Sequence, residues 1–159
     1  MSYTTSSRTS RGLPASLLVG GAFALTTVAN ILFRVADIVF TDTDPHRPEG
    51  PVESIVSISV VGGLGLLLAL AIALPLRRDP ARSRIGAIVL GSLALVSLPV
   101  WWSGAPAVLG AAAAWLAGLT TDGPPSQPGA ARGFGIVGFV VAVLVVVAVL
   151  VGNLSSYLG

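Results

Sequence analysis

Long apolar runs, separated by short polar or proline-rich segments, dominate the pattern along the chain. A helix needs about 20 apolar residues to cross a hydrocarbon core of about 30 Å. Five stretches reach or approach that length, and we predict a membrane span in each: about 13–36, 52–76, 85–101, 105–120 and 133–154. The pattern therefore predicts an all-α membrane protein, a bundle of five transmembrane helices that forms one domain over residues 13–159. The Ser/Thr-rich segment 1–12 is expected to be disordered and cytoplasmic.

The third and fourth spans raise the main question of topology, because only residues 102–104 separate them. The stretch 85–120 is about 36 residues long, too long for one crossing, and Pro99, Gly104 and Pro106 favour a tight helical hairpin within it. Both arms of this hairpin are short. Four spans, or three spans with a re-entrant hairpin over 85–120, therefore stay open as alternatives to five.

Composition supports the membrane class. Hydrophobic residues make up 53% of the 159 residues, and charged residues 10%, against about 25% in typical soluble domains. The mean hydropathy is +0.88. So few charges cannot cover a water-exposed surface. The net charge of +2 and the scattered arginines exclude a nucleic-acid binder, and the absence of cysteine excludes disulfides and thiol catalysis.

The arginines predict the orientation, since Lys and Arg concentrate on the cytoplasmic side of a membrane. Seven of the nine arginines fall on one predicted side: Arg8, Arg11, Arg77, Arg78, Arg82, Arg84 and Arg132. The other side holds two arginines and most of the acidic residues. We therefore predict a multi-pass protein of the cell (plasma) membrane, with its N-terminus inside and its C-terminus outside. Trp101, Trp102 and Tyr157 then fall at the outer interface, where aromatic residues concentrate.

The first span also has features of a signal peptide. Arg8 and Arg11 precede the apolar run, and residues 27–29 weakly resemble a small-residue cleavage site. The run of about 21 apolar residues is longer than the hydrophobic region of a signal peptide. We therefore interpret it as a span that is retained.

A polar cluster lies near the outer end of the first two spans. Asn30, Arg34 and Asp37 are four and three residues apart, which places them on one helical face. Arg34 lies about 31 Å along a helix from Leu13, at the outer interface. Glu53 begins the second span at the same level. We interpret the four as a structural polar cluster in which Arg34 pairs with Asp37 or Glu53, with substrate or proton handling as the alternative.

Hydroxyl side chains accompany this cluster on both spans: Thr26, Thr27, Ser54, Ser57 and Ser59. Hydrogen bonds between helices stabilise pairs of spans in lipid. We expect these groups to hold the first two spans together.

Two polar loops are weaker candidates for a site. The first carries four potential metal ligands: Asp42, Asp44, His46 and Glu49. Because Arg47 lies among them and the pattern of a calcium loop is incomplete, we expect a solvated acidic loop, no metal and no other cofactor. The second loop, 122–132, has three prolines and two glycines, which are typical of a flexible linker.

Small residues recur at four-residue spacing, most clearly at Gly110, Ala114 and Gly118. Such stripes allow close packing of helices in lipid. We expect most such stripes to pack within the chain, and this one is the best candidate for contact with another copy or another membrane protein.

No catalytic motif is present, such as a phosphate-binding loop with a lysine or paired histidines. We therefore expect a non-enzymatic protein whose partners are the lipid bilayer and a second copy or a larger membrane complex. The function predicted is that of an accessory or scaffold subunit. The alternative is a small-solute transporter or channel that acts as an oligomer.

The segment 93–110, LALVSLPVWWSGAPAVLG, resembles a group of small Ala/Gly-rich integral membrane proteins of high-GC actinobacteria, most of which are uncharacterised. The resemblance covers this hairpin and the general layout of spans. It implies a membrane location and carries no catalytic or binding residues.

Overall fold

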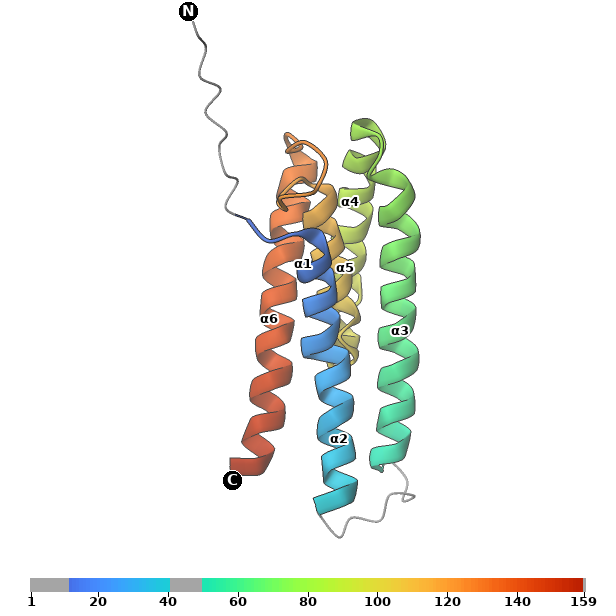
Figure 1. Ribbon diagram of the computed structural model, residues 1–159, viewed down its shortest axis with the longest axis vertical. Coiled ribbons are helices and arrows are strands. Elements are labelled where there is room, and N and C mark those ends of the chain that lie inside the picture. Colours follow the sequence, from blue (N-terminus) through green and yellow to red (C-terminus); the bar gives the residue numbers. More distant parts are fainter. Residues whose placement is uncertain (1–11, 41–49, 159) are drawn as a thin grey trace, which may run out of the picture.

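The computed structural model describes residues 12–40 and 50–158, with side chains over 12–40 and 50–155. All regular elements in these ranges are helical, which confirms the predicted all-α class. In chain order they are α1 (Ala15–Phe23), the π-helical turn η1 (Ala24–Val28), α2 (Ala29–Phe40), α3 (Pro51–Leu76), α4 (Pro80–Val96), the 3₁₀ segment η2 (Leu98–Ser103), α5 (Ala105–Leu116) and α6 (Ala130–Leu158) (Figure 1).

Three helices are long and apolar enough to cross a membrane. They cover Ala15–Phe40, which joins α1, η1 and α2, then Pro51–Leu76 and Ala130–Ser155, and each has 26 residues. At 1.5 Å per residue each is about 39 Å long, more than the hydrocarbon core requires. Their outward side chains are large and apolar, for example Leu67 and Leu144. These helices correspond to the first, second and fifth predicted spans.

The two remaining helices form a hairpin. Asp79 begins it as the N-cap of α4, where its Oδ1 accepts the Ala81 N–H at 2.9 Å. The chain turns through η2 and Gly104, which has φ of 81°. The break therefore falls where the prolines and Gly104 predict it. The arms are short, about 26 Å for α4 and about 18 Å for α5.

The turn of this hairpin lies beside the middle of the long helices. The Thr27 hydroxyl donates to the Ser103 carbonyl at 2.8 Å, and a Cβ at Gly62 would lie 2.6 Å from the same oxygen. Gly62 is about 17 Å from the start of α3 and about 21 Å from its end. Figure 1 shows the turn, in yellow, ending well before the lower ends of α2, α3 and α6.

This depth differs from the five-span prediction, which requires the turn to reach the far ends of the long helices. Trp101 and Trp102 belong to η2, so they lie beside the interior of the long helices and not beside their ends as predicted. The side chain of Tyr157 lies outside the described residues.

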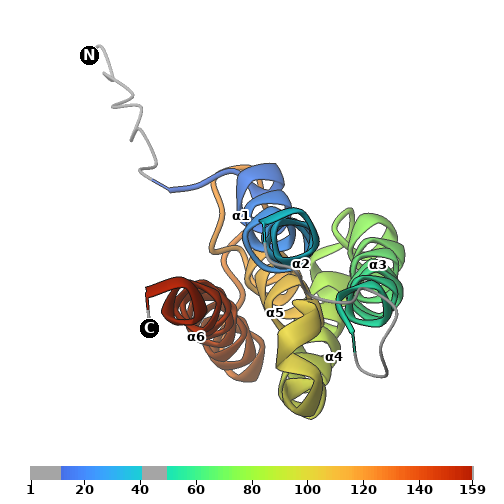
Figure 2. The same ribbon diagram turned by 90° about the horizontal axis from the view of Figure 1, so that it is seen from below.

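Helix α5 is the centre of the bundle, and α1, α3, α4 and α6 all pack against it (Figure 2). All twelve of its residues are buried. A Cβ at Gly110 would overlap the carbonyl group of Gly138 on α6, so the two backbones touch. Gly118 follows α5 with φ of 75° and contacts the loop at residues 124–126. The predicted helix-packing stripe packs within this chain: Gly110 and Ala114 are completely covered, and Gly118 packs against its own loop, so the stripe is not free to contact another chain.

The loop between α5 and α6 folds back onto the end of the bundle. The Asp122 carboxylate accepts the Ala15 N–H at 2.6 Å, and the Thr121 N–H donates to the Leu13 carbonyl at 3.2 Å. The buried Gln127 donates its backbone N–H to Ala117 at 3.0 Å. A loop predicted as a flexible linker therefore caps α1 and α5, because backbone groups at helix ends need partners.

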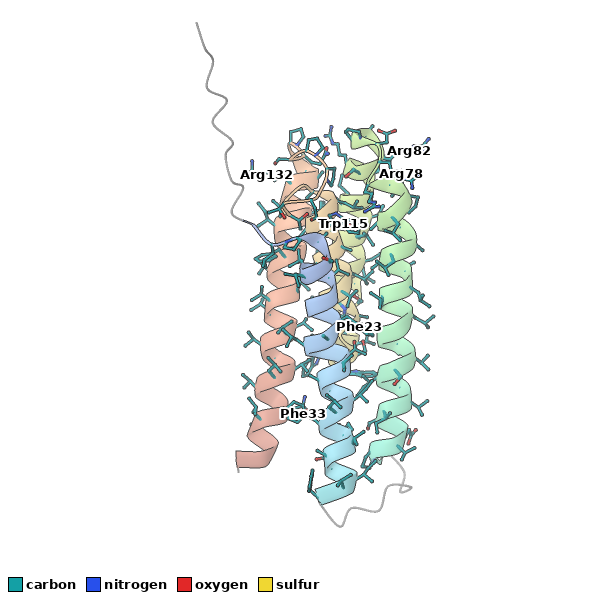
Figure 3. The ribbon with its side chains drawn as sticks, in the orientation of Figure 1. Phe23, Phe33, Arg78, Arg82, Trp115 and Arg132 are labelled. Carbon is teal, nitrogen blue, oxygen red and sulfur yellow. The ribbon has the colours of Figure 1, made fainter. Side chains whose placement is uncertain are left out.

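The charges separate to the two ends of the bundle. Among the described residues, one end, the arginine-rich end, carries five arginines: Arg77, Arg78, Arg82, Arg84 and Arg132. Figure 3 labels three of them at this end, Arg78, Arg82 and Arg132. Among the described residues, Asp79 and Asp122 are the acidic groups at that end. Arg34, Asp37 and Glu53 lie toward the opposite end. The described arginines thus gather where the charge pattern of the sequence places them.

Candidate functional site

A polar cavity of about 590 Å³ opens between α2 and α3, beyond the turn of the hairpin. It exists because α2 and α3 continue toward the end opposite the arginine-rich end, whereas the α4–α5 hairpin stops partway. We call it the vestibule. It is lined by Asn30, Arg34, Glu53, Ser54, Ser57, Ile58 and Trp102.

Asn30 fixes the inner end of the vestibule. The residue is 5% exposed, and its Nδ2 donates to the Trp102 carbonyl at 2.7 Å. Its Oδ1 accepts from Asn153 Nδ2 on α6 at 3.3 Å. One amide therefore joins α2, the hairpin turn and α6, and it satisfies a carbonyl that η2 leaves without a helical partner.

The π-helical turn η1 supports the hairpin turn from the side. Thr26 and Thr27 are adjacent, yet both are buried, and both hydroxyls approach the position that a Cβ of Gly104 would occupy. Single π turns within α-helices often occur at functional sites. Here the π turn places Thr26 and Thr27 against Gly104, which has no side chain and therefore allows the close contact.

The hydroxyl bonds differ from those predicted. Thr27 bonds the hairpin, Thr26 donates to Ala22 of its own helix at 2.6 Å, and Ser59 donates to Ile55 at 2.6 Å. The prediction that these three side chains bridge the first two spans is therefore wrong. A serine or threonine in a helix can bond the carbonyl four residues earlier, and both the buried Thr26 and the exposed Ser59 form this local bond.

The outer part of the vestibule is charged. Arg34 Nη1 lies 3.1 Å from Asp37 Oδ2 on the next turn of α2, and both side chains are partly exposed. Glu53 faces the same cavity from α3. The Nε of Arg34 is buried and has no hydrogen-bond partner among the described groups. A buried donor without a partner is energetically costly.

A smaller cavity of about 250 Å³ lies on the other side of α2, toward α6. It shares Asn30, Arg34 and Trp102 with the vestibule, and Asn153 contributes from α6. The polar region therefore surrounds α2 at this level.

The structure brings the four residues predicted as one polar cluster together, and Arg34 forms one of its two predicted pairs, the one with Asp37. Asn30, Arg34 and Glu53 line one cavity, and Asp37 pairs with Arg34 at its edge. Sequence reasoning missed Trp102 as a lining residue, because the depth of the hairpin cannot be read from the sequence. The four weak metal candidates Asp42, Asp44, His46 and Glu49 lie outside the described residues.

Fold and site together define a helical membrane protein with a polar cavity toward one end of its bundle. Comparisons with protein-family models, curated proteins and solved structures find no match.

Proposed function

We propose that the chain crosses the plasma membrane three times, through α1–α2, α3 and α6, and that α4 and α5 form a re-entrant hairpin. Its N-terminus lies inside and its C-terminus outside. Two observations support this topology. The hairpin turn is level with Gly62, about 5 Å from the midpoint between Glu53 and Arg77 on α3. The arginine-rich end holds both ends of the hairpin, as expected of a cytoplasmic face.

Fluorescence quenching by lipids tests the hairpin depth. A variant with Trp102→Phe and Trp115→Phe keeps Trp101, which is 41% exposed. In bilayers of brominated lipids we expect Trp101 to be quenched most by bromines near the bilayer centre. A tryptophan placed at the exposed Val52, in a chain without other tryptophans, is the shallow control. Strongest quenching of Trp101 by shallow bromines would instead support five crossings.

We further propose that the protein binds a small polar solute in the vestibule, from the outer side of the membrane. One observation carries this proposal, the polar cavity of about 590 Å³ that the short hairpin leaves open. Ligand sites commonly measure about 300–1,000 Å³ and have a few converging polar groups. Here a guanidinium, a carboxylate, an amide and two hydroxyls converge, which suits a ligand that both donates and accepts hydrogen bonds.

Binding without chemistry is the role that these residues support. The described lining of the vestibule offers two serine hydroxyls and the Glu53 carboxylate, without an imidazole or an amine. The inner end is closed by Ile58 and Trp102, and the bundle beyond is filled by buried α5. The geometry therefore supports an outward-open binding site more directly than a continuous channel. The small-residue stripe is covered within the chain and therefore adds no support to the accessory role predicted first.

Cysteine accessibility tests the vestibule, in a chain that contains no native cysteine. Ser57→Cys lines the cavity, whereas Ser59→Cys is exposed on α3 away from it. A small, membrane-impermeant methanethiosulfonate reagent added outside should modify Ser57→Cys at least about tenfold faster, because thiolates form in water and not in lipid. Equal rates, or reaction only from the inside, would contradict the proposed site.

The same variant identifies the ligand class. Amino acids, sugars and polyols, added singly at millimolar concentration, are screened for slower modification of Ser57→Cys. Protection by one class, and loss of that protection in Asn30→Leu, is the expected result. If none of the solutes protects and the chain co-purifies with a larger complex in mild detergent, the accessory role is supported instead.

A further inference from the structure

A third cavity lies at the arginine-rich end, on the opposite half of the molecule from the vestibule. It is a groove of about 320 Å³ between α1 and α3, whose back is formed by α5. Both α1 and α3 pack against α5, and the groove lies between them. Its walls are mostly apolar and include Val19, Gly20, Leu66, Leu70, Leu74 and Trp115.

The length of the groove matches one leaflet of a bilayer. Leu66, Leu70 and Leu74 follow each other at four-residue spacing, and Arg77 follows at the end of α3. From Leu66 to Arg77 the helix rises about 16 Å, which is half of a hydrocarbon core of about 30 Å. An acyl chain of a lipid in the adjoining leaflet therefore has a matching apolar surface.

The polar end of the groove has groups that suit a phosphate. The Arg77 guanidinium carbon lies 5.6 Å from the ring centroid of Trp115. Trp115 is 6% exposed, and its buried Nε1 has no hydrogen-bond partner among the described groups. Buried N–H groups are nearly always paired, and an indole can only donate. Arginine in turn offers several donors in a fork that fits a phosphate.

One carboxylate also lines the groove. Asp122 Oδ1 accepts the Ala15 N–H at 2.6 Å, which holds this side chain on the α1 side. Among the described residues, no carboxylate forms an ion pair with Arg77. The described residues at this end include five arginines and two aspartates, a net positive charge that favours an anion.

We propose that this groove binds an anionic phospholipid of the adjoining leaflet, with one acyl chain along Leu66, Leu70 and Leu74 and the phosphate at Arg77. The proposal is independent of the vestibule, since the two cavities share no residue. Uncharged or zwitterionic lipids fit the apolar part alone and are bound less strongly.

The test is the thermal stabilisation that added lipid gives to the purified full chain in neutral detergent. Dioleoyl phosphatidylglycerol should raise the melting temperature by on the order of 5 °C at about 100 times its dissociation constant. Dioleoyl phosphatidylcholine should give less than half of that shift, and inorganic phosphate none.

Two matched pairs of variants locate the site. Arg77→Gln should abolish the preference for the anionic lipid, whereas Arg78→Gln, an equal change of charge outside the groove, should keep it. Gly20→Leu should fill the groove and reduce the shift, whereas Gly21→Leu should not. At both glycines an added Cβ meets nothing within 4 Å, so both variants are expected to fold.

Three results would overturn the proposal. They are equal shifts from the two lipids, an anionic preference lost equally in Arg77→Gln and Arg78→Gln, or a phosphate shift as large as that of the anionic lipid. The last would assign the site to a free anion. The readout is the rise in melting temperature that lipid causes in each variant. A variant with a lower melting temperature without lipid can therefore still be compared.

Discussion

Gly110→Ala should destabilise the protein by at least about 3 kcal/mol, because the added methyl overlaps the Gly138 carbonyl group on α6. Backbone atoms lie on the other side of this contact, so no side chain can rotate away. The two helices would have to separate along the whole α5–α6 interface. For a chain of this size the expected fall in melting temperature is about 10 °C in detergent.

Gly63→Ala is the matched control. It is the same chemical change within a long helix, but a Cβ at Gly63 meets nothing within 4 Å. Alanine is the better helix former by about 0.5–1 kcal/mol, so this variant should be neutral or slightly more stable. If both variants lose the same stability, the close contact between α5 and α6 is not the cause.

The long helices could be predicted from the sequence because lipid exposure imposes a continuous apolar composition. The predicted spans 52–76 and 133–154 lie within α3 and α6, and the proline and glycine positions predict the break between α4 and α5. Each of these features depends on local residue types.

The depth of the hairpin could not be predicted, because it depends on contacts between distant segments. At Gly62 and Gly65 an added Cβ would meet Ser103 and Ala105, so these glycines let the hairpin turn approach α3. The small-residue pattern indicates that something packs closely there. It does not say whether the partner is another chain, another span or a hairpin that ends partway.

The vestibule was missed for the same reason. The sequence predicts that the polar residues near the outer ends of the first two spans bond one another. Arg34 and Asp37 do pair, but Asn30 and Thr27 bond the carbonyls of Trp102 and Ser103 on the hairpin. The hairpin turn accepts hydrogen bonds from the inner polar groups, Asn30 and Thr27. Arg34 and Glu53, farther out, line the cavity.

Gly104→Ala is expected to destabilise the protein at least as much as Gly110→Ala, because the cost of a positive φ adds to a steric overlap. Gly104 has φ of 81°, a conformation that costs an L-residue about 1–2 kcal/mol. Its Cβ would also lie 2.7 Å from the Thr26 Cβ and 2.6 Å from the Thr27 hydroxyl. The turn would move away from η1, and the Thr27–Ser103 hydrogen bond would be lost.

Gly129→Ala separates the two costs. Gly129 also has a positive φ, of 64°, but the nearest atom to its added Cβ is Arg84 Nη2 at 3.9 Å. Gly129→Ala should lower the free energy of unfolding only by the cost of the positive φ, about 1 kcal/mol. Gly104→Ala should lower it by three times as much or more. Displacing the turn should also alter the inner end of the vestibule, so Gly104→Ala should change the modification rate of Ser57→Cys and Gly129→Ala should not.

Equal losses of stability in the two variants, with no change in the modification rate of Ser57→Cys, would mean that the turn does not pack against Thr26 and Thr27. The vestibule would then need another inner boundary, because its closure by Trp102 depends on the turn being held at this depth.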